Sequence, residues 1–162
     1  MTRRVLGIDP GTAATGYGVL EAVARRPGRL VECGVVRTAA RAPLPDRLRT
    51  IYDGVTELIA QHQPDVVVVE SVFYGKNVRS SLTLSHARGV ILLAAAQAGI
   101  RVAEYSPATV KQAVAGRGRA AKTQIGYMVQ QLLRLQRPPT PADAADGVAV
   151  ALAYLLLAGR RP

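Results

Sequence analysis

Two carboxylates in this sequence stand where an apolar run stops and the chain turns away. Asp9 ends residues 5–9 and precedes a proline–glycine turn at residues 10–12, and Glu70 follows four consecutive valines. If the two runs are neighbouring parallel strands, both carboxylates lie at one edge of the sheet within a few ångströms. Like charges at that separation raise a pKa or recruit a cation. The sequence therefore predicts an acidic centre at this edge.

A third and a fourth acid, Asp143 and Asp146, are three residues apart and so share one face of a predicted helix. With Thr140 as N-cap and Pro141 as the first helical residue, Asp143 taken alone is better explained as an ordinary capping carboxylate. Asp146 lies one turn inside a helix that is otherwise almost entirely apolar. A carboxylate in that position needs a partner.

The other two acids also have structural alternatives when each is taken alone. Asp9 could bind the amides of its own turn, and Glu70 could end its strand in an ion pair. Four converging acids favour a cation site, and oxygen ligands in a chain with one cysteine, Cys33, indicate Mg²⁺, for which Mn²⁺ can substitute. Two such ions, about 3.5–4 Å apart, drive in-line displacement at phosphorus. We expect His62 to be solvated at a helix end and His86 to lie on a helix surface, both without a role.

The charge of the chain indicates a nucleic-acid partner. Lys and Arg number 21 against 11 acids, a net charge of +10, and setting aside the four proposed site acids leaves 21 − 7 = +14. Basic side chains bind phosphates and release condensed counterions. For any single arginine a solvated basic surface is the better explanation, but residues 116–122 together favour DNA. The basic residues predicted to reach phosphates are Lys76, Arg79, Arg88, Lys111, Arg117, Arg119 and Lys122.

Nothing in the sequence points to export or to a membrane. A lone cysteine excludes an internal disulfide and fits a reducing cytoplasm. Residues 1–9 lack the pattern of a signal peptide, and the most apolar stretch, residues 147–158, is shorter than the roughly 20 residues that a membrane span needs. We therefore expect a cytoplasmic protein.

The pattern of apolar residues predicts a single α/β domain over residues 1–162. Three strands, at residues 5–9, 17–23 and 30–38, form an antiparallel meander, with a turn at residues 25–28. A helix from residue 44 ends before Pro64, and a strand at residues 65–70 follows. The remaining predicted elements are a helix at 81–98, a strand at 101–105, and helical segments at 107–115, about 122–135 and about 140–158.

Five separated motifs resemble the RuvC family of Holliday junction resolvases. They are residues 6–18 (LGIDPGTAATGYG), 69–77 (VESVFYGKN), 87–90 (ARGV), 110–112 (VKQ) and 142–146 (ADAAD). Together they extend over nearly the whole chain, in order. The resemblance implies a ribonuclease-H-like fold, with a five-stranded mixed sheet of three antiparallel and then parallel strands flanked by helices. It also implies a homodimer that nicks two strands of a four-way DNA junction symmetrically in recombination and repair, working with RuvA and RuvB.

The resemblance also assigns roles to individual residues. Asp9, Glu70, Asp143 and Asp146 match the catalytic, metal-binding acids, although some relatives carry histidine at the position of Asp143. Lys111 and Lys122 match substrate-binding lysines. Phe73 matches an aromatic residue that inserts near unstacked bases, although a core position after a strand explains a phenylalanine equally well. The other DNA-binding residues predicted in the Phe73 loop are Tyr74, Lys76 and Asn77.

Three other functions share part of this pattern. Residues 7–12 resemble the phosphate-binding turn of actin, Hsp70 and sugar-kinase ATPases, but those enzymes need two such domains. A compact RuvC-like nuclease acting on ribosomal RNA shares the first motif. A non-catalytic DNA-binding module leaves four acids that would repel DNA unexplained.

The helix at residues 81–98 is apolar around most of its circumference, which has two explanations. It could form a dimer interface through outward-facing residues such as Leu82 and Leu93, or it could be sandwiched between the sheet and the last helix.

Overall fold

The computed structural model describes residues 3–71 and 77–158, which form five strands and five helices in the predicted order. The sheet has the order β3-β2-β1-β4-β5, with β1, β2 and β3 antiparallel and β1, β4 and β5 parallel. This confirms the predicted mixed sheet. The elements are β1 (Arg4–Asp9), β2 (Ala14–Val23), β3 (Arg26–Arg37), α1 (Leu44–His62), β4 (Val66–Glu70), α2 (Val78–Gln97), β5 (Arg101–Tyr105), α3 (Pro107–Ala115), α4 (Lys122–Leu133) and α5 (Ala142–Ala158).

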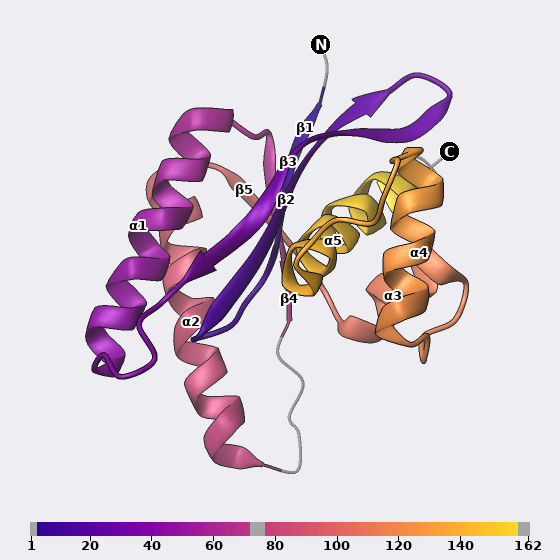
Figure 1. Cartoon of the computed structure of the whole chain (residues 1–162). Coiled ribbons are helices and arrows are strands. Elements are labelled where there is room, and N and C mark those ends of the chain that lie inside the picture. The colour runs from indigo at the N-terminus through magenta and orange to yellow at the C-terminus, as the bar shows by residue number, and fades with distance from the viewer. Residues whose placement is uncertain (1–2, 72–76, 159–162) are drawn as a thin grey trace.

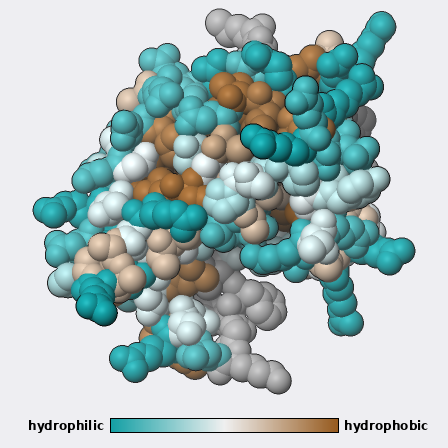
Figure 2. Space-filling model, viewed as in Figure 1, coloured by the Kyte–Doolittle hydropathy of each residue, from teal (hydrophilic) through white to brown (hydrophobic). Residues whose placement is uncertain are grey.

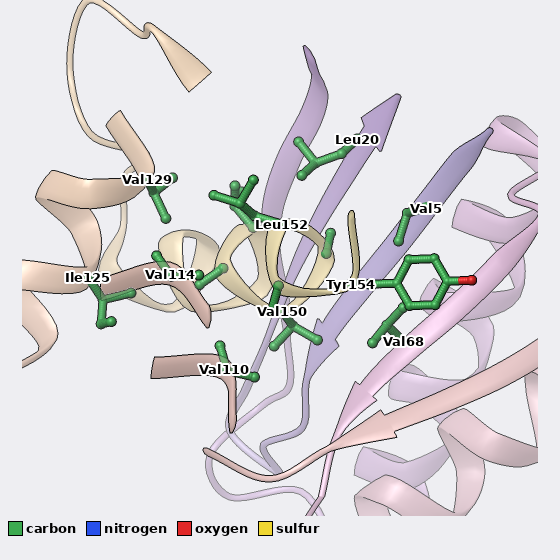
Figure 3. Close-up of a cluster of buried hydrophobic side chains, with 14 of the residues drawn as sticks. Val5, Leu20, Val68, Val110, Val114, Ile125, Val129, Val150, Leu152 and Tyr154 are labelled. Atoms are coloured by element: carbon green, nitrogen blue, oxygen red, sulfur yellow. The ribbon is translucent and has the colours of Figure 1, made fainter. Parts of the chain in front are cut away.

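Helices cover both faces of the sheet, with α1 and α2 on one side and α3, α4 and α5 on the other (Figure 1). The alternation of β1 divides its side chains between two cores, since Leu6 and Ile8 pack with α1 and α2 while Val5 packs with α5. Figure 3 shows α5 in the middle of the second core, between the sheet residues Val5, Leu20 and Val68 and the α3 and α4 residues Val110, Val114, Ile125 and Val129.

Glycines allow α5 to lie unusually close to β1 and β2. A Cβ added at Gly7 would lie 2.3 Å from the backbone nitrogen of Ala151, and one at Gly16 would lie 1.8 Å from the carbonyl oxygen of Asp143. In the reverse direction, a Cβ at Gly147 would lie 2.4 Å from the backbone of Tyr17. Helix and sheet are therefore in backbone contact, and this contact brings the start of α5 to the end of β1.

The structure corrects the predicted turn between the second and third strands. Only Ala24 and Arg25 form it, with Arg25 at φ 61°, and residues 26–28 already belong to β3. Proline and glycine at residues 27 and 28 are ordinary turn signals, but here Gly28 is buried in the strand beneath Leu155 of α5.

One further prediction is wrong, and one of the two explanations for the helix at residues 81–98 is excluded. His62 is 6% exposed rather than solvated, because the end of α1 packs against the sheet and places its Nε2 3.1 Å from Oε2 of Glu32. Helix α2 is not sandwiched between the sheet and the last helix, since it packs against α1 and β5 while α5 lies on the opposite face. His86 is exposed on α2, as predicted.

Candidate active site

The ends of β1 and β4 bring Asp9 and Glu70 together at the carboxyl edge of the sheet. The two strands are parallel neighbours with Ile8 opposite Val69, so each carboxylate follows a paired residue. Alternation along both strands puts the two side chains on the face that α5 covers. From the sequence this juxtaposition depended on the two strands being parallel neighbours, and the pairing of β1 with β4 meets that condition.

The two carboxylates line a cleft between the sheet edge and helices α3, α4 and α5. Its cavity volume is about 190 Å³, room for several water molecules. Asp146 enters the cleft from α5, and the side chains of Val110, Ile125 and Ala149 form an apolar part of the cleft wall. The lining residues are Asp9, Glu70, Pro107, Val110, Lys111, Lys122, Ile125, Asp146 and Ala149.

Burial and the negative charges nearby raise the pKa of the two acids at the sheet edge, Asp9 and Glu70. Burial raises the pKa of Asp9 to about 8, and the charges of Glu70, Asp146 and Asp143 contribute to this rise against the opposing effect of Lys122. Burial likewise raises the pKa of Glu70 to about 7, with a further contribution from Asp146. Carboxylates in such surroundings gain most from a cation that neutralises them together.

Lys122 supplies part of that positive charge, because its Nζ lies 2.9 Å from Oδ2 of Asp146. The pKa of Lys122 is raised, first by this hydrogen bond and then by the charges of the acids around it. Among residues 3–71 and 77–158, no three Asp, Glu, His or Cys side chains are close enough together to bind one metal ion as they are placed. The donors nevertheless fit a hard cation, since those of Asp9, Glu70 and Asp146 are all carboxylate oxygens. An ion bound at Oδ2 of Asp146 would compete with Lys122 for that oxygen.

Asp143 lies at the margin of this group. Helix α5 begins at Ala142, one residue later than the predicted first helical position, so Asp143 is in its first turn. It is not among the residues that line the cleft, although its charge contributes to the raised pKa of Asp9. This position is compatible both with a ligand and with the helix-end role described above.

The structure divides the predicted DNA-binding residues. Lys111 and Lys122 line the cleft, and the exposed side chains of Arg79, Arg117 and Arg119 can reach a ligand outside it. Figure 2 shows hydrophilic side chains over most of one face of the molecule, with apolar patches between them.

Besides Lys122, which pairs with Asp146, two of the predicted DNA-binding residues have partners within the fold. Arg88 forms an ion pair with Glu104 of β5. Asn77 is the N-cap of α2, where its side chain accepts a hydrogen bond 3.2 Å from the amide of Ser80. Phe73, Tyr74 and Lys76 lie outside the described residues.

The sequence did not predict the contacts that hold the acids of the cleft in position. Helical periodicity predicts that Val110, Ile125 and Ala149 lie in helices, but not that they line the cleft. It also does not predict that the glycines of β1 and β2 lie against the backbone of α5. A usable signal existed, because Gly16 and Gly18 alternate on one face of β2, which is typical of a surface that another backbone approaches closely.

A mixed sheet with an acidic cleft at its carboxyl edge and basic side chains around it defines a nuclease of the ribonuclease-H-like fold. Residues 5–154 match the family model described as "Crossover junction endodeoxyribonuclease RuvC". The chain belongs to this RuvC family.

Relatives and solved structures agree over nearly the whole chain. A crossover junction endodeoxyribonuclease RuvC from Halorhodospira halophila is 53% identical over 93% of this chain and 89% of its own, and one from Pelotomaculum thermopropionicum is 50% identical over 93% and 91%. The structure of Thermus thermophilus RuvC superposes with a TM-score of 0.86 at 36% identity, covering 96% of this chain and 95% of its own. T. thermophilus RuvC in complex with a Holliday junction substrate gives 0.86 at 33% identity, over 97% and 95%.

None of the helices within residues 3–71 and 77–158 is both long and apolar enough to cross a membrane.

Proposed function

We propose that this protein resolves Holliday junctions, as an endonuclease that nicks two DNA strands symmetrically and depends on a divalent metal. The observation that carries the proposal is the convergence of Asp9, Glu70 and Asp146 in one cleft, from three elements that are far apart in the sequence. The similar T. thermophilus RuvC has been solved in complex with a Holliday junction substrate, which supports the same substrate here. The reaction serves DNA recombination and repair and takes place in the cytoplasm.

In the proposed site, Asp9, Glu70 and Asp146 hold the metal with Asp143 beside them, and Mg²⁺, as two ions, is the metal that we propose. When bound, these ions supply the activation of water and the stabilisation of the leaving oxygen in an in-line displacement at phosphorus. The chain's own contribution is to hold the carboxylates in place and to exclude water along the apolar wall of the cleft. Lys111 lowers the pKa of Glu70, and so keeps that carboxylate closer to its charged, binding form.

The basic residues around the cleft position the DNA in this proposal. Lys111 and Lys122 contact the phosphates nearest the cut, while Arg79, Arg117 and Arg119 contact phosphates farther away. Phe73 stacks on an unpaired base at the junction, a contact worth about 1–3 kcal/mol. By family resemblance, RuvA and RuvB are the proposed protein partners.

A homodimer would place two copies of the cleft against the two symmetric strands of a junction. Helix α2 is the proposed interface, because Leu82 is 57% exposed and Leu93 49% exposed. Val78, in the first turn of the same helix, is 69% exposed. Large apolar side chains exposed along one helix are typical of a surface that a partner covers.

The test is cleavage of a synthetic four-way junction in Mg²⁺, with duplex DNA and RNA of matched sequence as controls. Asp9→Asn, Glu70→Gln and Asp146→Asn should each abolish cutting while junction binding is kept or strengthened, because each removes a negative charge from the site but no basic side chain. Near wild-type cutting by any one of them would show that this residue is not a ligand. Equal cutting of RNA would favour the ribosomal RNA nuclease.

A further inference from the structure

Hydrogen bonds to three successive carbonyl groups, those of Gly11, Thr12 and Ala13, hold the loop that follows Asp9. Gly11 is held by Thr15, whose Oγ1 donates to its carbonyl oxygen at 2.7 Å and accepts from its amide at 3.3 Å. Thr15 itself is fully buried. The carbonyl of Ala13 accepts from the amide of Thr38 at 3.1 Å. The loop between β1 and β2 therefore has little freedom to move.

The carbonyl between these two, that of Thr12, is bound by two side chains. The Oγ1 of Thr38 donates to it at 2.5 Å, and the Nε of Arg47 donates to it at 3.1 Å. The same Nε also lies 3.2 Å from Oγ1 of Thr38, so the three groups form a closed triangle. Arg47 is in the first turn of α1, on the face of the sheet opposite the cleft, and its side chain is only partly exposed.

We propose that Arg47 and Thr38 are positioning residues for the metal site: they fix the loop that begins directly after Asp9 and thereby hold its carboxylate where a divalent cation can use it. The inference rests on the proposed function, in which Asp9 is a ligand. Metal ligands are effective only within about 0.5 Å of their productive position, and losing an outer residue that orients a ligand typically weakens metal binding about 10–100-fold. A bond between a cationic side chain and a carbonyl is among the stronger hydrogen bonds available for this purpose.

The alternative is that Arg47 acts through its charge alone, by attracting DNA. Arg49 provides a matched control, because it lies two residues farther along α1, is exposed, and makes only a loose ion pair with Asp46 at 3.7 Å. Thr38→Val tests the loop without changing any charge, since it removes the hydroxyl group and keeps the shape of the side chain. The variants to compare are Arg47→Ala, Thr38→Val and Arg49→Ala.

Two measurements separate these roles. The first is Mn²⁺ binding to the DNA-free protein, followed by electron paramagnetic resonance, and the second is junction affinity in EDTA. We expect Arg47→Ala and Thr38→Val each to weaken Mn²⁺ binding by about tenfold and to raise the Mg²⁺ concentration for half-maximal cleavage similarly. Both should bind the junction within about twofold of Arg49→Ala, which should keep wild-type metal binding.

Several results would overturn the inference. One is unchanged Mn²⁺ binding in both Thr38→Val and Arg47→Ala. Another is a loss of junction affinity in Arg47→Ala while Thr38→Val keeps wild-type junction affinity and Mn²⁺ binding, because the charge of Arg47 alone would then explain the effect. If Arg47→Ala does not fold, as judged by thermal melting, the uncharged Thr38→Val decides. Asp9→Asn separates failure of the proposed site from failure of this inference: if it cuts normally, the site is wrong, and if it is inactive while both positioning variants bind Mn²⁺ normally, only the positioning role fails.

Discussion

Gly147→Ala tests whether the contact between α5 and the sheet sets the position of the acids. The new Cβ would lie 2.4 Å from both the Cα and the nitrogen of Tyr17, and 2.6 Å from the carbonyl carbon of Gly16. These are backbone atoms in the middle of a strand and cannot rotate away. Since carbon atoms pack at about 3.5 Å, α5 has to move by about 1 Å. Asp146 lies one residue before the substitution and has to move with it.

The magnitude follows from two opposing effects. Overpacking in a close-packed interior costs about 1–3 kcal/mol of unfolding free energy, while replacing a helical glycine with alanine returns up to about 1 kcal/mol. We expect a net loss of about 1–2 kcal/mol, which lowers the melting temperature by about 2–8 °C in a chain of this size. A displacement of about 1 Å at a reacting centre can reduce the rate about a hundredfold. Cleavage of a four-way junction should therefore fall much more than the stability does.

Gly126→Ala is the matched control, because this glycine is also helical but has nothing within 4 Å of the added Cβ. It should raise the melting temperature by about 1–4 °C and leave cleavage unchanged. A Gly147→Ala variant that melts as Gly126→Ala does and cuts the junction at the wild-type rate would refute a positioning role for this contact.

Three further predictions concern parts of the molecule outside the cleft. The hydrogen bonds from Arg4 and Arg29 lower the pKa of Glu21, so its stabilisation is complete above the unfolded pKa near 4.5 and is lost as the pH falls through the lower folded value. Glu21→Gln should therefore lower the melting temperature at pH 7, and this difference from wild type should shrink below pH 4; a constant difference would contradict the assignment. Leu93→Glu should sediment as a folded monomer without paired nicking, whereas a wild-type monomer at micromolar concentration that still nicks in pairs would exclude the dimer. Phe73→Ala should weaken junction processing with little change in melting temperature, and a loss of about 3–5 kcal/mol would instead make Phe73 a core residue.

Local pattern predicted most of this fold. Four consecutive valines, as before Glu70, are typical of a strand covered on both faces, and β4 does lie inside the sheet between β1 and β5. The same pattern placed Asp9 and Glu70 each at the end of a strand, and the structure shows that these two strands are parallel neighbours. Periodicity did not predict how deeply individual residues are buried. Nothing in the repeat of α1 shows that its last residue, His62, is covered by the sheet and paired with Glu32.

Contacts between residues far apart in the sequence were the main omission. Arg47 is one of many arginines in a basic chain, and only the folded structure shows that its Nε binds the carbonyl of Thr12, 35 residues away. Arg88 resembles the DNA-binding residues for the same reason, although it pairs with Glu104. The sequence shows the sign of the charge on a side chain, but the partner of that side chain depends on how separate elements pack together. Individual arginines were therefore the least predictable part of the site.

The distribution of the acids is the strongest argument against a purely DNA-binding role. Outside the cleft, the buried carboxylate of Glu21 is bound by two arginines, as expected for a carboxylate removed from water, and even the exposed Glu104 is bound by one. Within the described residues, by contrast, Asp9 and Glu70 form no salt bridge, although both are partly buried at a sheet edge with each other as neighbours. A protein that only binds DNA would gain by replacing such acids, since they repel phosphates and destabilise the fold at the same time. Their placement is explained if a cation joins them when the protein acts, because that cation neutralises the acids and attracts the phosphate to be cut.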